Sequence, residues 1–128
     1  MPLKENIIAI RELLTDPDHW CQGKMSQNKL GHYANHSSRE ATSWCMVGAM
    51  CKVMGINTYI KHEYIELRDF IEIHLPGEAC IVKKRIEAWN DDEDRTHQDV
   101  LDFLDEAIAS LEPKKARIVK EERILENA

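Results

Sequence analysis

Apolar residues recur at steps of three and four along most of this 128-residue chain, which is the spacing of amphipathic α-helices. The stripes are Leu3, Ile7, Ile10 and Leu14; Ile60, Tyr64, Leu67 and Ile71; Ala79, Val82, Ile86 and Trp89; and Val100, Phe103, Leu104, Ala107, Ile108 and Leu111. Alternation around Ile71, Ile73 and Leu75 leaves a minor strand open as an alternative there. The pattern predicts an all-α fold, a compact single-domain bundle of about five helices.

Helix boundaries can be placed from capping signals. Ser37-Ser38-Arg39-Glu40 has the spacing of a capping box, so we expect the central buried helix to begin there and to end at Gly55. Thr96 is expected to cap the last helix. Residues 16–37 read as a long loop, which is either a functional element or contains short helical turns. Residues 1–112 are expected to form the domain, and 113–128 a charged C-terminal helix or tail.

Charge is concentrated in one segment. The chain carries a net charge of −6. Residues 90–106 hold eight acidic residues against Arg95 alone, whereas acids and bases balance over residues 1–89. An acidic face disfavours direct binding to nucleic acid and attracts a basic protein surface or a cation.

The composition also indicates a compartment. No run of about 18 apolar residues is present, and the first residues lack the apolar stretch of a signal peptide. Cys45 and Cys51 lie in an apolar segment, where reduced cysteines behave as small hydrophobes. We expect no membrane span, free thiols and a cytoplasmic location in a bacterial or infected host cell. The patterns do not define an oligomeric state.

Three segments resemble a known family. They are Asp16-Pro17-Asp18-His19-Trp20-Cys21-Gln22-Gly23, then Trp44-Cys45-Met46-Val47-Gly48-Ala49, and then Trp89-Asn90-Asp91 followed by Arg95-Thr96-His97-Gln98-Asp99-Val100 and Leu104-Asp105-Glu106-Ala107-Ile108. These motifs are similar to those of a family of small bacterial and phage proteins, a domain of unknown function. The resemblance spans roughly residues 5–111. It implies a compact helical domain and supplies no activity.

The segment from Trp89 to Asp99 is the main candidate site. Trp89 completes an apolar stripe and is predicted to lie in the core, and Asn90 suits the left-handed position that ends a helix. Arg95 and His97 have no evident structural role. The residues predicted to bind a partner are Asp91, Asp92, Glu93, Asp94, Arg95, His97 and Asp102. The favoured hypothesis is a non-catalytic interaction or regulatory protein, bacterial or phage-encoded, whose partner protein has a basic surface.

An alternative hypothesis is a thiol-dependent hydrolase or acyl transferase. Cys45 would be the nucleophile, His97 the base, and Asn90 or Asp91 would orient the imidazole. Such an enzyme needs a thiolate, which the first turn of a helix beside an imidazolium favours. A helix that begins at Ser38 places Cys45 two turns in, beyond this help.

A metal site is a further alternative. His19, Cys21, His32 and His36 offer the nitrogen and sulfur ligands that zinc prefers. Their spacing matches no standard zinc finger, and exposed loop histidines are the favoured explanation. The acidic run lacks the alternate ligands and turning glycine of a calcium loop. No cofactor is therefore favoured, and zinc is the one retained for testing.

Overall fold

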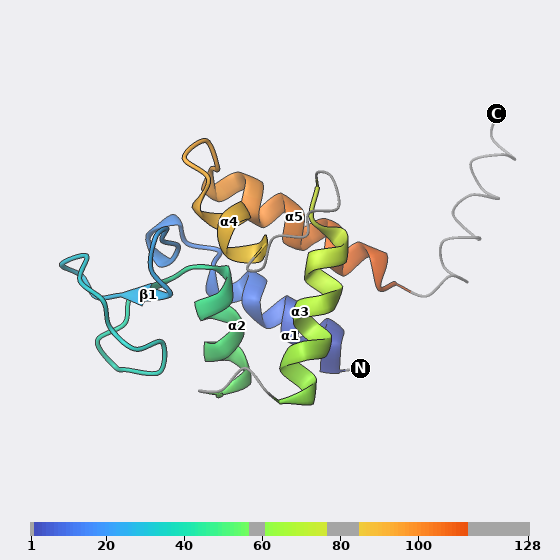
Figure 1. Ribbon diagram of the computed structural model, residues 1–128, viewed down its shortest axis with the longest axis horizontal. Coiled ribbons are helices and arrows are strands. Elements are labelled where there is room, and N and C mark those ends of the chain that lie inside the picture. The colour runs from blue at the N-terminus through green and yellow to red at the C-terminus, as the bar shows by residue number, and fades with distance from the viewer. Residues whose placement is uncertain (1, 57–60, 77–84, 113–128) are drawn as a thin grey trace, which may run out of the picture.

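The computed structural model describes residues 2–56, 61–76 and 85–112 and is mostly helical (Figure 1). Its elements in chain order are α1 (Pro2–Leu13), the 3-10 turn η1 (Pro17–His19), β1 (Ser26–Gln27), β2 (Ser43–Trp44), α2 (Met46–Met54), α3 (His62–His74), α4 (Arg85–Asp91) and α5 (His97–Ser110). The expected helical bundle is confirmed, but β1 and β2 make the fold mostly helical rather than all-α. The expected tail, 113–128, and the first part of the fourth stripe lie outside the described residues.

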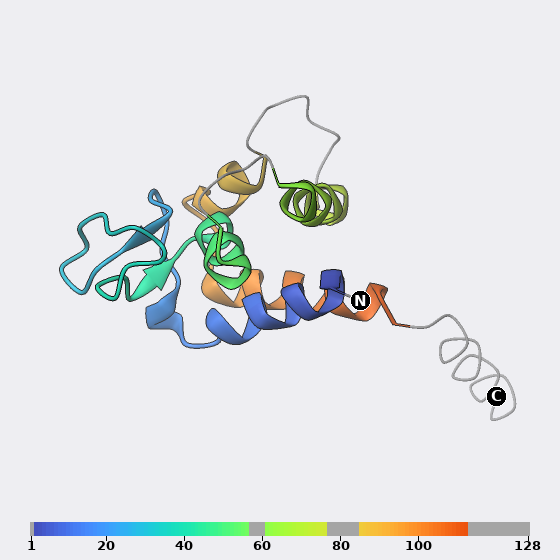
Figure 2. The same cartoon turned by 90° about the horizontal axis from the view of Figure 1, so that it is seen from below.

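The helices pack around one apolar core. Figure 2 shows α1 and α5 side by side, with α2 against α1 and the strands at one end of the molecule. The fully buried side chains include Ile7, Ile10 and Leu14 of the first predicted stripe, together with Tyr64, Leu67, Ile71, Ile86, Val100 and Leu104 from the others. Each such side chain contributes roughly 1.5–3 kcal/mol by its burial. The described members of these stripes therefore contribute to the core or pack against it, and the strand alternative near Ile71 gives way to α3.

The start of the central helix differs from the prediction. The helix α2 begins at Met46, not at Ser38, and Cys45 is its N-cap. The Ser38 hydroxyl instead accepts a hydrogen bond from the Glu40 backbone N–H at 3.1 Å, so it closes a local turn. Serine side chains support turns and helix caps through similar local bonds, which is why the sequence pattern was misleading. The helix ends at Gly55 in a left-handed conformation, as predicted.

The long connection is ordered by strand pairing and close packing. Within it β1 pairs antiparallel with β2, and η1 supplies a short helical turn. The Met25 carbonyl accepts a hydrogen bond from the Cys45 N–H at 3.0 Å. A Cβ atom on Gly48 would lie 1.9 Å from that same oxygen. The absence of a side chain at Gly48 thus allows the first turn of α2 to pack on the loop.

The start of α5 follows the prediction. Thr96 caps the helix, and its backbone N–H donates to the Asp99 carboxylate at 3.0 Å in a reciprocal capping box. That bond lowers the pKa of the Asp99 carboxyl. The end of α4 does not follow the prediction, because the helix runs through Asn90 to Asp91. Asn90 is therefore a helical residue rather than a left-handed helix end.

Within the described ranges, no helix combines the length and apolar character that a membrane span requires. Cys21, Cys45 and Cys51 are buried and free, in agreement with the expected reduced thiols, whereas Cys80 lies outside the described residues.

Candidate functional site

The side chain of Asn90 connects three distant segments of the chain. It is fully buried. Its Oδ1 accepts hydrogen bonds from Trp20 Nε1 at 2.8 Å and from the Met46 backbone N–H at 3.0 Å. Its Nδ2 donates to the Cys21 carbonyl at 3.1 Å and to Asp91 Oδ1 at 2.9 Å. One amide thereby satisfies buried groups of the loop after α1 and of the first turn of α2.

The neighbouring residues extend this network to the loop after η1. Asp91 Oδ1 also accepts from the Gly23 backbone N–H at 2.9 Å. The Gln22 amide donates to the carbonyls of Asn90 and Asp92 at 2.9 and 2.8 Å. The Gln22 and Gly23 contacts hold the end of α4 against the loop. Asp91, predicted to bind a partner, consequently has a structural role even though it is exposed.

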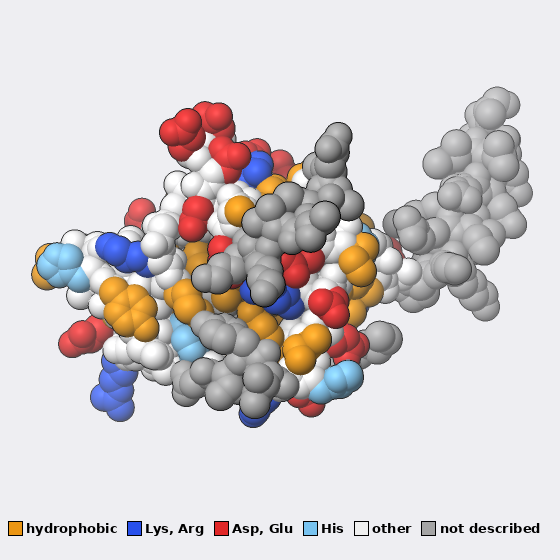
Figure 3. All heavy atoms as spheres, in the orientation of Figure 1, with side chains coloured by type: hydrophobic (Ala, Val, Ile, Leu, Met, Phe, Trp, Pro, Cys, Tyr) orange, Lys and Arg blue, Asp and Glu red, His pale blue; other side chains and the backbone are white. Residues whose placement is uncertain are grey.

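The next three residues, Asp92, Glu93 and Asp94, are exposed. We call these three residues the acidic turn, and its carboxylates form the red group at the top of Figure 3. Asp92 closes the turn, since its Oδ1 accepts from the Asp94 N–H at 2.9 Å. None of the three carboxylates forms an ion pair with any residue that the structure describes. The acidic turn therefore presents uncompensated negative charge to solvent.

Arg95 and His97, which had no evident structural role in the sequence, both have one. The Arg95 guanidinium carbon lies 4.0 Å from the centre of the Trp89 ring, and Arg95 Nε donates to the Trp89 carbonyl at 2.9 Å. His97 Nε2 lies 2.6 Å from the Leu14 carbonyl, so it carries a proton and donates to that oxygen. This contact joins the start of α5 to the end of α1, and it turns His97 inward from the acidic turn.

A cleft lies beside Arg95 on the surface formed by α5 and the end of α3. Its volume is about 310 Å³. The described lining residues are Trp89 and Phe103, whose rings are 5.2 Å apart, with His74, Pro76, Arg95, Asp99, Asp102 and Glu106. Trp89 is buried as predicted, but its Nε1 has no hydrogen-bond partner among the described residues. The cleft thus combines aromatic surface with carboxylates from the predicted partner-binding segment.

Cys45 and His97, the predicted nucleophile and base, have different surroundings in the structure. Cys45 is 5% exposed, and its Sγ accepts from the Gly48 N–H at 3.4 Å. As the N-cap of α2 it is closer to a helix start than predicted, yet burial raises the pKa of its thiol to about 12. The thiol is therefore protonated at neutral pH, which acts against a nucleophilic role. His97 bonds Leu14, and its ring lies 6.2 Å from that of Trp20.

The predicted zinc ligands have individual contacts. His19 Nδ1 lies 3.2 Å from the Leu13 carbonyl, and Cys21 Sγ lies 3.6 Å from the Lys24 carbonyl. His32 is exposed and His36 is buried. In the described part of the chain, no group of three or more His, Cys, Asp or Glu residues is arranged to hold a metal ion. Zinc binding stays a prediction, which elemental analysis of the purified protein would test.

Comparison with known proteins places the chain in a family. It belongs to DUF6197, a family of unknown function, whose model matches residues 1–110. The matched region runs from the start of the chain to the last residue of α5, so it includes every helix and strand described above. No curated protein and no solved structure matches the chain. The resemblance read from the motifs is confirmed at the level of an uncharacterised family.

Proposed function

We propose that this protein is a non-catalytic interaction protein that binds a basic surface of a partner protein through the acidic turn. The main observation in support is that the carboxylates of Asp92, Glu93 and Asp94 are exposed together and form no ion pair among the described residues. Three such charges repel one another, and a basic partner relieves this repulsion while it accelerates association.

The cleft beside Arg95 supports the same proposal. Protein interfaces gain most of their affinity from a few aromatic or arginine residues in a desolvated centre, with charged residues at the rim. Here Trp89 and Phe103 supply the aromatic surface, and Asp102 and Glu106 line the same cleft. A partner that contacts the acidic turn and this cleft would therefore find an apolar anchor beside the charge.

The fixed backbone of the turn favours recognition. Gln22 bonds the Asp92 carbonyl, and the Asp92 carbonyl also accepts from the Arg95 N–H at 2.9 Å. Because these bonds fix the turn before a partner arrives, less conformational entropy is lost on binding.

The test is a double charge reversal, Glu93→Lys with Asp94→Lys, in a pulldown from the source organism followed by mass spectrometry. Glu93 and Asp94 are suited because no described hydrogen bond involves their carboxylates, whereas Asp91 bonds Gly23 and Asn90. We expect at least one protein to be retained by the wild type and lost from this variant. Its retention should fall as salt rises, since screening weakens exposed charge pairs.

The matched control is Glu63→Lys with Glu66→Lys, which makes the same charge change on the exposed start of α3. A partner specific for the acidic turn stays bound to this control. If the same proteins are retained by the wild type and both variants, the acidic turn is not a binding surface.

A further inference from the structure

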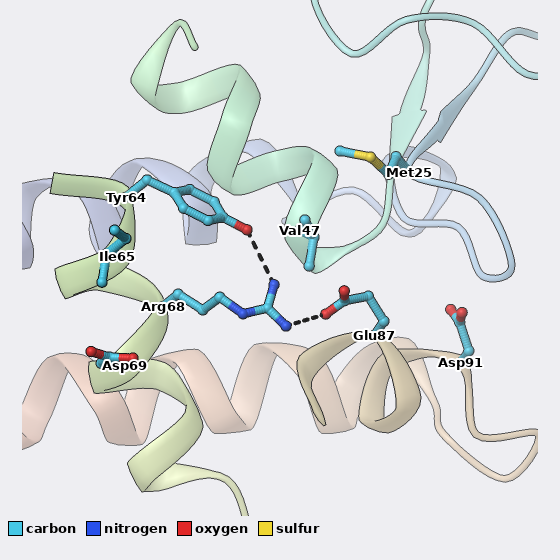
Figure 4. Close-up of a pocket in the computed structure, with 8 residues that line it drawn as sticks. All are labelled: Met25, Val47, Tyr64, Ile65, Arg68, Asp69, Glu87 and Asp91. Atoms are coloured by element: carbon cyan, nitrogen blue, oxygen red, sulfur yellow. Dashed lines mark hydrogen bonds and ion pairs between the residues drawn. The ribbon is translucent and has the colours of Figure 1, made fainter. Parts of the chain in front are cut away.

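A second pocket lies between α2, α3 and α4, away from the aromatic cleft. Its volume is about 600 Å³, which is within the range of small-molecule sites. The described residues that line it are Met25, Val47, Tyr64, Ile65, Arg68, Asp69, Glu87 and Asp91. Figure 4 shows them converging from the loop before β1 and from the three helices. The pocket is therefore lined by both apolar and charged side chains.

The positive charge in the pocket is already neutralised. Arg68 extends from α3 across the pocket toward α4 (Figure 4). Its guanidinium donates to Glu87 Oε1 at 2.6 Å and to the Tyr64 hydroxyl at 3.1 Å, and its Nε lies 3.4 Å from Glu72 Oε1. Its charge is balanced by the carboxylates of Glu87 and Glu72, so Arg68 has little charge left to attract an anionic ligand.

The negative charge, in contrast, exceeds what Arg68 balances. Among the described lining residues, Asp69, Glu87 and Asp91 are acidic and Arg68 alone is basic. Glu87 uses only Oε1 for Arg68, and Asp91 uses only Oδ1 for Gly23 and Asn90. Their second oxygens keep lone pairs for another donor, as do both oxygens of Asp69 among the described contacts. The electrostatics of this pocket therefore favour a cation.

The apolar part of the lining determines what kind of cation fits. Met25, Val47 and Ile65 supply aliphatic surface, and Ile65 is 45% exposed. A hydrated metal ion gains nothing from such a wall, whereas the methylene chain of an aliphatic amine packs on it while the charged head stays at the carboxylates. We propose that this pocket binds an aliphatic primary amine, with its chain against Val47 and Ile65 and its ammonium group near Glu87 and Asp91.

The proposal is independent of the acidic turn. The same ligand chemistry has two sources, a free small amine and the side chain of a lysine on another protein. Both place one ammonium group and four or five methylene groups in the pocket, so the experiment has to separate them.

The test titrates the full-length, isotope-labelled protein with pentylamine and follows the methyl resonances of Val47 and Ile65 by NMR. Pentan-1-ol and pentanoate serve as neutral and anionic probes of the same chain length. We expect saturable shifts with pentylamine and at least tenfold weaker binding of the other two. Equal binding of pentylamine and pentan-1-ol would overturn the proposal, since the carboxylates would then contribute nothing.

Isosteric variants locate the ammonium group. Asp69→Asn and Asp91→Asn each remove one charge, and Asp91→Asn keeps an oxygen for the Gly23 N–H. Asp91→Asn should weaken pentylamine binding several-fold and Asp69→Asn, which is farther from the proposed ammonium position (Figure 4), should weaken it less, whereas Glu66→Gln, on α3 outside the pocket, should leave it unchanged. If Glu66→Gln weakens binding as much as the pocket variants do, the effect is one of net charge and the proposed site is wrong.

A final titration compares a lysine side chain with a free amine and so identifies the source of the ammonium group. N-acetyl-lysine methylamide carries the same ammonium group on a peptide unit. Tighter binding of this compound than of pentylamine supports the site and assigns it to a partner's lysine, and tighter binding of pentylamine supports it and assigns it to a free amine. The variant Glu93→Lys with Asp94→Lys should keep amine binding in either case, which separates this proposal from the proposed function.

Discussion

Asn90 and the acidic turn are neighbours in the chain, and they occupy opposite environments. Asn90 is fully buried and forms four hydrogen bonds. Asp92, Glu93 and Asp94 are exposed, and their carboxylates form no described ion pair. Polar residues that are close together in the sequence can therefore have different roles. Those whose hydrogen-bonding groups are satisfied inside the protein are structural, and the others are exposed.

Chemistry explains why the division falls between these residues. An amide is neutral and both donates and accepts, so Asn90 can satisfy Trp20, Met46 and Cys21 together. A carboxylate is charged and accepts only, and its burial without a paired cation is costly. The last turn of α4 points Asn90 inward, and the chain after Asp91 leaves the helix for solvent.

The strongest test of this division is Asn90→Ala. The change leaves the Trp20 indole N–H and the Met46 N–H without an acceptor inside the protein. Each unsatisfied buried group costs about 1–3 kcal/mol, so we expect a loss of about 3 kcal/mol or more in the free energy of unfolding, measured by urea denaturation. Asp92→Asn is the control and should cost less than about 0.5 kcal/mol. Similar losses of unfolding free energy in both variants would show that Asn90 stabilises the fold no more than the exposed Asp92 does.

The buried thiols near this network predict an alkaline transition. Burial raises the pKa of Cys45 from 9.0 to about 12 and that of Cys51 to about 11, and it also raises the pKa of Cys21. The protonated thiols therefore favour the folded state, so their contribution is complete below pH 9 and is lost as pH rises toward these values. By pH 10.5 we expect Cys45 alone to account for a loss of about 2 kcal/mol in unfolding experiments.

The variant Cys45→Ala should lower stability at pH 7 and show a shallower decline between pH 9 and 11. A decline with the same slope as in the wild type would mean that another group titrates.

Trp20 and Trp89 allow a similar comparison between two indole N–H groups. Trp20 donates its indole N–H to Asn90, whereas the N–H of Trp89 has no partner in the part of the chain that the structure describes. Trp20→Phe should lower stability by about 1–3 kcal/mol, because it leaves Asn90 short of a donor and shrinks a packed ring. Trp89→Phe loses ring volume without losing a bond, so thermal unfolding should show the smaller effect. A larger loss at Trp89 would indicate that the cleft contributes more to stability than the Asn90 network does.

A smaller effect is expected at the start of α5. Thr96→Ala removes the hydroxyl that accepts from the Asp99 N–H at 3.1 Å and should cost about 1 kcal/mol. Thr96→Ser keeps that hydroxyl and is the matched control. Equal unfolding free energies for the two variants would show that the cap hydrogen bond does not stabilise the helix.

The smallest effect on stability is expected in the acidic turn. Glu93→Lys with Asp94→Lys should change the free energy of unfolding by less than about 0.5 kcal/mol, because both side chains are exposed. Circular dichroism during thermal unfolding measures this directly. A large destabilisation would show that Glu93 and Asp94 have a structural role. The acidic turn would then not differ from Asn90 in this respect.

Local patterns predicted much of the fold correctly. The apolar stripes placed α1, α3 and α5, and Thr96 was identified as the cap of α5. The start of α2 was wrong by eight residues, since Ser38 and Met46 are both followed by plausible helical sequence. The pairing of β1 with β2 takes residues 43–44 out of the helix, and two-residue strands leave almost no periodic signal.

The contacts made by the candidate segment were only partly predicted. The segment around Trp89 was singled out, but Asn90 was assigned to a helix end because its partners are about 45 and 70 residues away in the chain. The family resemblance held a possible signal, because the Asn90 side chain joins the three segments that carry that resemblance. No pattern in the sequence around Arg68 indicated the pocket that this side chain crosses.

The sequence by itself determined the helical class, the apolar core stripes and the location of the negative charge, because these depend on residue spacing and composition along one segment. Tertiary structure alone decided that Asn90 is buried, that Gly48 admits the Met25 carbonyl, and that His97 faces Leu14. Each of these depends on a partner distant in the chain, and hydrogen bonding over such distances has no periodic trace in the sequence.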